Sequence, residues 1–298
     1  MFKVNFISRK FFQIYLKLNK YLVYNDVLFT KAKYYCKNKV NINLDNPTEF
    51  MEKIQWLKLF HYTQNYGNFV DKYEARNYVE TKIGSQYLNA IYGVFDAVDA
   101  INFENLPNQF VLKGTHGSGY NVIVKDKNQI NENKIIQQLN CFLHKNYYFE
   151  NRESIYKNVK PRILIEKYIS EVDCEGLIDY KFYCFHGVPK YVLVKVCLNG
   201  EDKKCYYDLN WNKIIPEQIP NDFLNSAIEK PSNFEEMLTI AAKLAAEFIF
   251  IRVDLYSIGE KIIFGELTFF PTGGNKRISV ERFNKEFGDL MHLPNQTS

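Results

Sequence analysis

Residues 110–126, FVLKGTHGSGYNVIVKD, decide the fold of this chain. The apolar and β-branched residues near both ends of the stretch predict two strands, and the three glycines between them predict a loop. Glycine lets backbone N–H groups come close to phosphate oxygens, and Lys113 adds a positive charge at the end of the first strand. We interpret the stretch as a phosphate-binding strand, loop and strand, with an ordinary hairpin as the alternative.

The loop differs from a P-loop, although Gly114 and Gly119 have the G-x-x-x-x-G spacing of that motif. Tyr120 and Asn121 follow where a P-loop has lysine and then serine or threonine, and no helix pattern comes next. Kinases and ATP-grasp enzymes instead place a strand, loop and strand over their nucleotide. The position of Lys113 before the loop favours the ATP-grasp arrangement.

The composition is that of a globular protein with one large domain or two closely joined ones. The chain has 298 residues, of which 46% are hydrophobic and 16% aromatic, so it can bury a large core. No stretch is apolar enough to span a bilayer, and Lys10, Lys17 and Lys20 interrupt the apolar region that a cleavable signal needs. We therefore expect a cytoplasmic protein. The six cysteines include no C-x-x-C pair, which favours reduced thiols over disulfides or zinc.

Basic and aromatic residues gather at the start of the chain. Residues 1–40 contain nine lysines and arginines and one acid, whereas the whole chain has a net charge of only +4. Phe11, Ile14, Leu18 and Leu22 recur there at helical spacing beside lysines. We expect this segment to make a peripheral contact with the inner face of a membrane, or else to pack on its own domain. No nucleic-acid-binding motif accompanies the basic residues, so no nucleic-acid partner is expected.

Two helix starts are predicted in the first third of the chain. Glu74 follows Asp71 in the spacing of a capping box, and Gly84 is placed to end that helix. Lys72 lies in its first turn, near a helix N-terminus that favours anions. The stretch NPTE at 46–49 predicts the other start, with its asparagine as the cap and its proline in the first position.

A hairpin at 248–271, centred on Gly259, combines apolar strands with four polar side chains. An unpaired carboxylate would be costly to bury there. If the turn comprises the three residues 258–260, all four polar side chains share one face and the two acids are diagonal neighbours. The acids could then hold a hard cation together with phosphate oxygens, and a salt bridge of the arginine with either acid is the alternative. The polar residues are Arg252, Asp254, Glu266 and Thr268.

Together these segments resemble the ATP-grasp superfamily and, within it, the teichuronopeptide-biosynthesis (TupA-like) type, over roughly residues 45–293. The resemblance implies an α+β fold in which two α+β subdomains grip ATP between their sheets. We expect a helical N-terminal region at 1–70, subdomain A at 71–165 and subdomain B at 166–298. The segments that carry the resemblance are NPTEFMEKIQWLK (46–58), DKYEARNYV (71–79), FVLKGTHGSGYNVIV (110–124), IEKYI (165–169), DYKFYCFHG (179–187), RVDLY (252–256) and FGELTFFPTGG (264–274).

The resemblance also implies a role for individual residues. Lys72 and Lys113 match phosphate-binding lysines, residues 117–119 match the loop over the phosphates, and Lys167 lies in a segment that matches the adenine hinge. Asp173 matches a ribose-binding acid. The expected nucleotide-binding residues are Lys72, Lys113, His116, Gly117, Ser118, Gly119, Glu166, Lys167, Ile169 and Asp173.

The same resemblance assigns the polar hairpin. Asp254 and Glu266 match magnesium ligands, and Thr268 stands where the family has an asparagine, which leaves the number of metal ions open. Arg252 matches an arginine that balances charge on an acyl phosphate. Lys181, in DYKF, is a further expected site residue. The expected catalytic residues are Arg252, Lys113 and Lys181.

These roles imply an ADP-forming carboxylate–amine ligase that uses ATP and Mg²⁺ and passes through an acyl phosphate. The acid is expected to be a uronic acid of a bacterial surface or capsular polysaccharide, free, nucleotide-linked or polymeric, and the other substrate an amino acid or small amine. A glycosyltransferase and a sugar kinase are the alternatives. The absence of a D-x-D motif and of G-x-G-x-x-G argues against the first. The identity of both substrates and the oligomeric state are left open.

Overall fold

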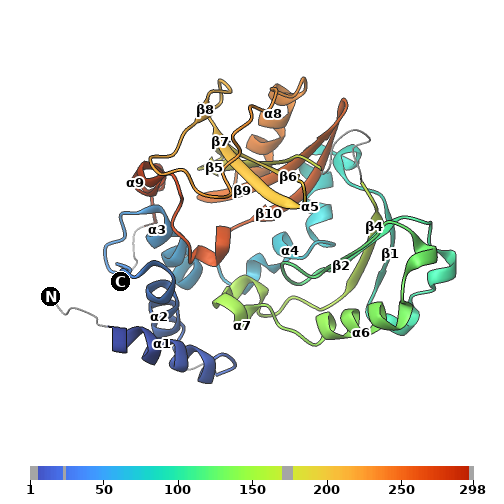
Figure 1. The fold of residues 1–298 in the computed structure, drawn as a ribbon, viewed down its shortest axis with the longest axis horizontal. Helices are drawn as coiled ribbons and strands as arrows, with labels where there is room; N and C mark the ends of the chain where they lie inside the picture. The colour runs from blue at the N-terminus through green and yellow to red at the C-terminus, as the bar shows by residue number, and fades with distance from the viewer. Residues whose placement is uncertain (1–5, 23–24, 170–176, 295–298) are drawn as a thin grey trace.

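The computed structural model describes residues 6–22, 25–169 and 177–294 (Figure 1). It has two antiparallel sheets of four and six strands together with helices, which confirms the predicted α+β fold. The strands are β1 (Ile91–Phe95), β2 (Phe110–Gly114), β3 (Asn121–Val124), β4 (Ile163–Lys167), β5 (Asp179–Phe185), β6 (Val188–Leu198), β7 (Glu201–Tyr207), β8 (Lys213–Ile214), β9 (Phe250–Ile258) and β10 (Lys261–Thr268). The α-helices are α1 (Phe6–Leu18), α2 (Asp26–Asn38), α3 (Phe50–Trp56), α4 (Gly67–Val70), α5 (Ala75–Ile83), α6 (Glu132–Leu143), α7 (Tyr148–Asn151), α8 (Phe234–Ala245) and α9 (Glu281–Asp289).

The four-stranded sheet has the order β1-β4-β2-β3. The β2–β3 hairpin encloses the glycine loop, and Lys113 pairs with Asn121 at its mouth. Side chains alternate along β2, so Phe110 and Leu112 are buried against α6, where they join Leu139 in one core. Lys113 therefore lies on the opposite face of this sheet from α6.

The six-stranded sheet has the order β10-β9-β5-β6-β7-β8. Helix α8 packs on one of its faces, where Phe234 contacts Phe182 with ring centroids 6.0 Å apart. On the other face, Phe50 of α3 meets Phe185 and Phe250 at 6.1 and 5.0 Å. Because side chains alternate along β9, the positions that follow Phe250 on this second face are 252 and 254. The apolar end of the face is thus covered by helices, and the polar residues begin two residues further along the strand.

Helices α1 and α2 pack against each other and project from the rest of the molecule, at the lower left of Figure 1. Arg152, which follows α7, fastens them. Its guanidinium donates to the backbone carbonyls of Asn19, Lys20 and Leu22 at 2.8, 2.9 and 2.9 Å. Its Nε lies 3.2 Å from a carboxylate oxygen of Asp26. One buried side chain therefore holds the end of α1 and the start of α2.

Two predicted helices begin later than the sequence pattern indicates. Helix α3 is capped by Glu49, and Glu52 closes the capping box, so the predicted start within 46–49 was three residues early. Helix α5 begins at Ala75, because residues 71–74 form a turn before it. At α5 the predicted cap Asp71 still accepts from the backbone N–H groups of residues 73 and 74, but these belong to the turn before the helix.

Three strands were not predicted. β1 is short and contains a glycine, β7 (EDKKCYY) begins with exposed charges, and β8 has only two residues, so none has a clear period-2 pattern. The cysteines were predicted correctly as unpaired within the described residues. The free thiols there are Cys36, Cys141, Cys184, Cys197 and Cys205.

Candidate functional site

The hairpin of β9 and β10 has a shorter turn than predicted. Ile258 pairs with Lys261, so the turn consists of residues 259–260 and not of three residues. Continued without interruption, this register would place Glu266 opposite Val253, on the face away from Asp254.

A β-bulge at Gly265 corrects the register. Beyond it Glu266 pairs directly with Asp254, and Thr268 pairs with Arg252. The prediction that these four side chains share a face is confirmed, but the two acids are directly opposite each other and not diagonal. Glycine suits the bulge because a Cβ at this position would lie 3.0 Å from the backbone oxygen of Asp254.

Arg252 lies between the two carboxylates. Its Nε and Nη2 each donate to Asp254 at 2.6 Å, a bidentate contact, and Nη2 also reaches Glu266 at 3.4 Å and the Thr268 hydroxyl at 2.9 Å. The salt-bridge alternative is therefore present in this structure. Asp254 is buried, whereas the side chain of Glu266 is 41% exposed, so only Glu266 presents a carboxylate at the surface of the cluster.

Lys181 adds a second positive charge from the neighbouring strand. It pairs with Asp254 across β5 and β9, and its Nζ lies 2.6 Å from the Asp254 carboxylate. Burial alone would raise the pKa of Asp254, but the charges of Arg252 and Lys181 and their hydrogen bonds outweigh burial and hold that pKa below its ordinary value. Asp254 is therefore ionised at neutral pH.

Asp179 completes the cluster and was not among the predicted site residues. Its Oδ2 forms an ion pair with Lys181, and its buried Oδ1 has no hydrogen-bond partner. Burial, followed by the nearby charge of Asp254, raises the pKa of Asp179 to about 6. Its place in DYKF, two residues before Lys181 on a strand, was the sequence signal that could have identified it, since residues i and i+2 share a face.

The cluster contains oxygen donors of the kind that a divalent cation binds. At pH 7 the three carboxylates of Asp179, Asp254 and Glu266 outnumber the two cations Lys181 and Arg252, so the cluster has a net charge of −1. Carboxylate and hydroxyl oxygens are ligands that Mg²⁺ accepts. Within the described residues there is no ready group of three His, Cys, Asp or Glu side chains placed to hold a metal. In this structure both Asp254 oxygens are bonded to cationic side chains.

Lys72 contacts the glycine loop. Its Nζ donates to the carbonyl of Gly117 in the glycine loop at 2.5 Å. Burial lowers the pKa of Lys72, the charge of Glu266 opposes this effect, and the charge of Lys113 adds to it. Lys72 therefore lies within electrostatic reach of both the acidic cluster and the lysine of the phosphate loop.

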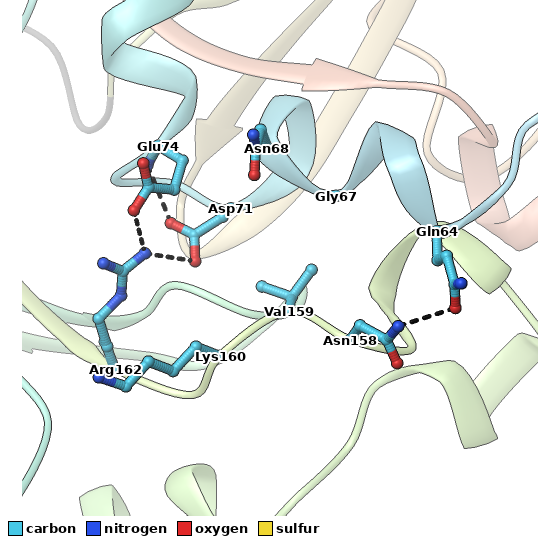
Figure 2. Close-up of a pocket in the computed structure, with 9 residues that line it drawn as sticks. All are labelled: Gln64, Gly67, Asn68, Asp71, Glu74, Asn158, Val159, Lys160 and Arg162. Atoms are coloured by element: carbon cyan, nitrogen blue, oxygen red, sulfur yellow. Dashed lines mark hydrogen bonds and ion pairs between the residues drawn. The ribbon is translucent and has the colours of Figure 1, made fainter.

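Asp71 fixes the turn that carries Lys72 (Figure 2). One carboxylate oxygen accepts from the backbone N–H groups of residues 73 and 74, and the other accepts from Thr115 at 2.9 Å and Arg162 at 3.1 Å. Arg162 also pairs with Glu74 at 2.8 Å. These ion pairs form part of the wall of a polar cavity of about 230 Å³. Because its charges are already paired, we interpret this region as a support for Lys72.

Lys113 and Glu166 pair with each other at 2.6 Å across β2 and β4. Just beyond Glu166, the predicted adenine hinge borders a cavity of about 500 Å³ between the end of β4 and the tip of the β9–β10 hairpin. The lining combines apolar side chains with polar ones, as small-molecule pockets generally do. The lining residues are Gln86, Leu88, Asn89, Ala90, Gln109, Lys167, Tyr168, Ile169, Ile258, Lys261 and Ile263.

Two predicted nucleotide ligands are not placed with the rest. Asp173 lies outside the described residues. His116 is buried with 2% exposure, its Nε2 is hydrogen bonded to the Phe142 carbonyl at 2.9 Å, and its ring packs on Tyr120. The structure leaves no surface of His116 for a nucleotide, and its position is that of a core residue beneath the loop. Ser118 and Gly119 are exposed at the loop tip.

An aromatic wall beside the glycine loop had no sequence signal. A Cβ on Gly117 would lie 2.6 Å from Tyr120 and 2.9 Å from Tyr147, so only glycine fits there. The ring of Tyr147 in turn contacts Tyr156 with centroids 4.8 Å apart. Burial, and then the charges of Glu153 and Glu266, raise the pKa of Tyr156. Segment 147–156 thus approaches both the loop and the acidic cluster.

This chain resembles known proteins in sequence and in structure. A sequence model described as TupA-like ATPgrasp matches residues 52–292, and no curated protein matches the chain. D-alanine–D-alanine ligase from Bacillus anthracis complexed with ATP is 16% identical with a TM-score of 0.45, over 76% of this chain and 65% of that one. The ATP-grasp ligase PsnB with its minimal precursor is 10% identical with a TM-score of 0.44, over 76% and 60%. The chain thus spans less than two thirds of the length of either protein.

Proposed function

Because the chain belongs to the TupA-like ATP-grasp family, we propose that it is an ATP-dependent carboxylate–amine ligase that forms an amide and releases ADP and phosphate. We propose further that the acid is a uronic acid of a bacterial surface polysaccharide and that the amine is an amino acid or a small amine. The proposed sugar and amine rest on the resemblance to the teichuronopeptide-biosynthesis type. The geometry of the site supports the proposed reaction.

The observation that carries the proposal is an acidic cluster within electrostatic reach of Lys72, which also lies within reach of Lys113. Glu266 and Asp254 lie opposite each other on the six-stranded sheet, and Lys72 lies within electrostatic reach of both Glu266 and Lys113. A triphosphate needs cations along its length and acidic ligands for its metal ion. The cavity beside Lys167 would take the base at the other end of the nucleotide.

The chain's own residues then act mainly by charge and position. Asp254, Glu266 and the Thr268 hydroxyl would hold Mg²⁺, which supplies charge neutralisation at the phosphate oxygens. Lys72 and Lys113 would stabilise the negative charge of the transferred phosphoryl group. Lys72 also bonds the Gly117 carbonyl, so phosphate binding is coupled to the position of the glycine loop.

Arg252 has the donors that an acyl phosphate requires. The substrate carboxylate would attack the γ-phosphorus of ATP, break the bond to the bridging oxygen and release ADP. The amine would then attack the acyl carbon, lose a proton and release phosphate. Arg252 already forms four hydrogen bonds to oxygen atoms in the cluster. A guanidinium can exchange such partners for phosphate oxygens without a change of charge.

The decisive experiment measures ADP, phosphate and coupled product together. Purified protein is mixed with ATP, Mg²⁺, single uronic acids or nucleotide-linked uronates, and pooled amino acids and amino alcohols, and mass spectrometry detects the amide. We expect ADP release to require both the acid and an amine, and hydroxylamine to replace the amine and give a hydroxamate.

Two outcomes would contradict the proposal. ADP release with a stable phosphorylated sugar and no hydroxamate would identify a kinase. Consumption of a sugar nucleotide without ATP would identify a glycosyltransferase. Glu266→Gln should lose ADP release. Lys243→Gln, which changes an exposed lysine on α8, should leave the product spectrum unchanged. Together these two results would connect the activity to this site.

A further inference from the structure

Helix α1 presents an apolar stripe to solvent. Phe11, Ile14 and Leu18 are 65%, 53% and 70% exposed, and Tyr21 and Leu22 continue the stripe just beyond the helix at 70% and 46%. Phe11, Ile14 and Leu18 are spaced by three and four residues, which places them on one side of the helix. Scattered exposed apolar residues are ordinary, but five that gather on one helix and the residues just after it indicate a surface that is covered in function.

The stripe faces outward because the opposite side of α1 is occupied. Phe12 packs on Tyr35 of α2 with ring centroids 5.7 Å apart. Arg152 holds the backbone carbonyls of Asn19 and Lys20 at the end of the helix. The helix therefore cannot turn its apolar stripe toward the protein without breaking buried hydrogen bonds, which would be costly.

The charges beside the stripe are all positive. Residues 6–22 contain four basic residues and no acid. Lys10 and Lys17 are exposed, and neither takes part in an ion pair within the part of the chain that the structure describes. Lys20 is paired with Glu150 at 2.7 Å. The free positive charges thus lie at the edge of the apolar stripe.

The apolar stripe and the positive charges together favour a membrane surface over a second copy of this chain as the partner that covers the stripe. A basic helix with an aromatic and aliphatic face is typical of helices that lie in the membrane interface. A symmetric dimer through the same stripe would bring Lys10 and Lys17 against their own copies, and like charges across an interface are unfavourable. No helix among the described residues is both long and apolar enough to cross a bilayer.

We propose that the stripe of α1, with Lys10 and Lys17 at its edge, docks the protein on an anionic lipid surface. The apolar side chains enter the headgroup region, and the lysines contact lipid phosphates or carboxylates. The contact depends on the α1–α2 pair being held by Arg152, because that anchor fixes the direction in which the stripe points. This inference does not depend on the proposed reaction.

Sedimentation with vesicles tests the proposal. The full-length protein is mixed at low salt with vesicles of phosphatidylcholine alone or with about 30% phosphatidylglycerol, and the bound fraction is measured as lipid concentration rises. We expect binding only to the anionic vesicles, and weakening at higher salt because exposed charges are screened over about 10 Å at 0.1 M.

Matched variants separate the stripe from general surface effects. Phe11→Ser with Leu18→Ser should weaken binding about tenfold or more through lost apolar contact. Lys10→Gln with Lys17→Gln should weaken it about 25-fold, since each basic residue near an anionic surface contributes roughly fivefold. Ile123→Ser and Ile219→Ser change apolar residues that are 58% and 59% exposed elsewhere, and they should bind as wild type does.

Circular dichroism confirms that each variant is folded. The proposal is overturned if wild type does not bind anionic vesicles at low salt, or if the stripe variants bind as tightly as the Ile123 and Ile219 controls. Light scattering during size-exclusion chromatography supplies the remaining test. The proposal is also overturned if the protein does not bind vesicles and forms a dimer that the Phe11 and Leu18 changes dissociate. That result would show that a second copy of this chain covers the stripe.

Discussion

Arg252 and Arg152 are both nearly buried, with side chains 12% and 1% exposed, but they bind different kinds of group. Arg252 contacts two carboxylates and a hydroxyl. Arg152 contacts three backbone carbonyls, one carboxylate and the ring of Phe29, which lies 4.1 Å from its guanidinium carbon. Backbone carbonyls cannot leave an arginine without a change of fold, whereas side-chain oxygens can. The comparison therefore identifies Arg152 as a structural residue, and it leaves Arg252 with partners that it could exchange in the proposed reaction.

The largest effect is expected at Arg252. Replacement by lysine keeps the charge but cannot supply a bidentate contact to Asp254 together with the contacts to Glu266 and Thr268. We expect Arg252→Lys to lower kcat for ADP release by about 10²- to 10³-fold, the range found when one preorganised donor is removed. Steady-state kinetics measure the loss. Activity within threefold of wild type would place Arg252 with Arg152 as a structural residue.

Arg152→Met should affect stability and leave the acidic cluster intact. The change removes a buried cation, leaves three carbonyls without their donor and removes the ion-pair partner of Asp26. We expect the free energy of unfolding to fall by about 3 kcal/mol, the lower part of the range for breaking a buried charged contact. Urea unfolding measures it, and limited proteolysis should show cleavage first near residues 19–22. A variant as stable as wild type would refute the anchoring role.

The two carboxylates that Arg252 contacts should respond differently. Glu266 is partly exposed, so Glu266→Gln should lower turnover about 100-fold with a change in stability below about 0.5 kcal/mol. Asp254 is buried between Arg252 and Lys181, so Asp254→Asn should lower turnover and stability together. Repulsion between two neighbouring acids would predict the opposite stability change, but the arginine between them removes that repulsion. Equal melting temperatures for both variants would contradict this difference.

The smallest expected effect is a pH dependence at Asp179. Its pKa is raised to about 6 in the folded protein, so between about pH 4 and 6 the folded state holds a proton that the unfolded state has lost. Stability then falls as pH rises through this window, by about 2 kcal/mol from this group. Asp179→Asn should remove that decrease, and the difference between variant and wild type in urea unfolding at pH 4 and pH 7 measures it. Parallel pH profiles would show that Asp179 does not titrate in this way.

The sequence predicted the acidic cluster well because strands have a period of two. Polar residues at 252, 254, 266 and 268 stood out on apolar strands, and such positions share a face whenever the register allows. The strand, glycine loop and strand at 110–124 were equally clear, since glycines between two β-rich runs are a local signal. Lys181 was predicted together with the family resemblance, and Asp179 lies two residues before it on the same face.

The remaining features depend on contacts between distant segments. Arg152 lies in a left-handed conformation after a four-residue helix, and its partners are more than 120 residues away. Tyr147 and Tyr156 reach the site from irregular segments with no periodic pattern. His116 was predicted to bind the nucleotide because it lies in the glycine loop. Tertiary packing against Phe142 buries it instead. Local patterns contain no information about such long-range contacts.

The bulge at Gly265 divides the β9–β10 hairpin into two parts with separate registers. Residues 258, 261 and 263, which line the cavity beside the hinge, lie on the turn side of the bulge, and the acidic cluster lies on the other. Removal of a residue from the bulge would restore regular pairing and still leave the glutamate opposite Asp254. The lining of the cavity at the hairpin tip can therefore diverge during evolution, or be redesigned, while the acidic cluster keeps its alignment.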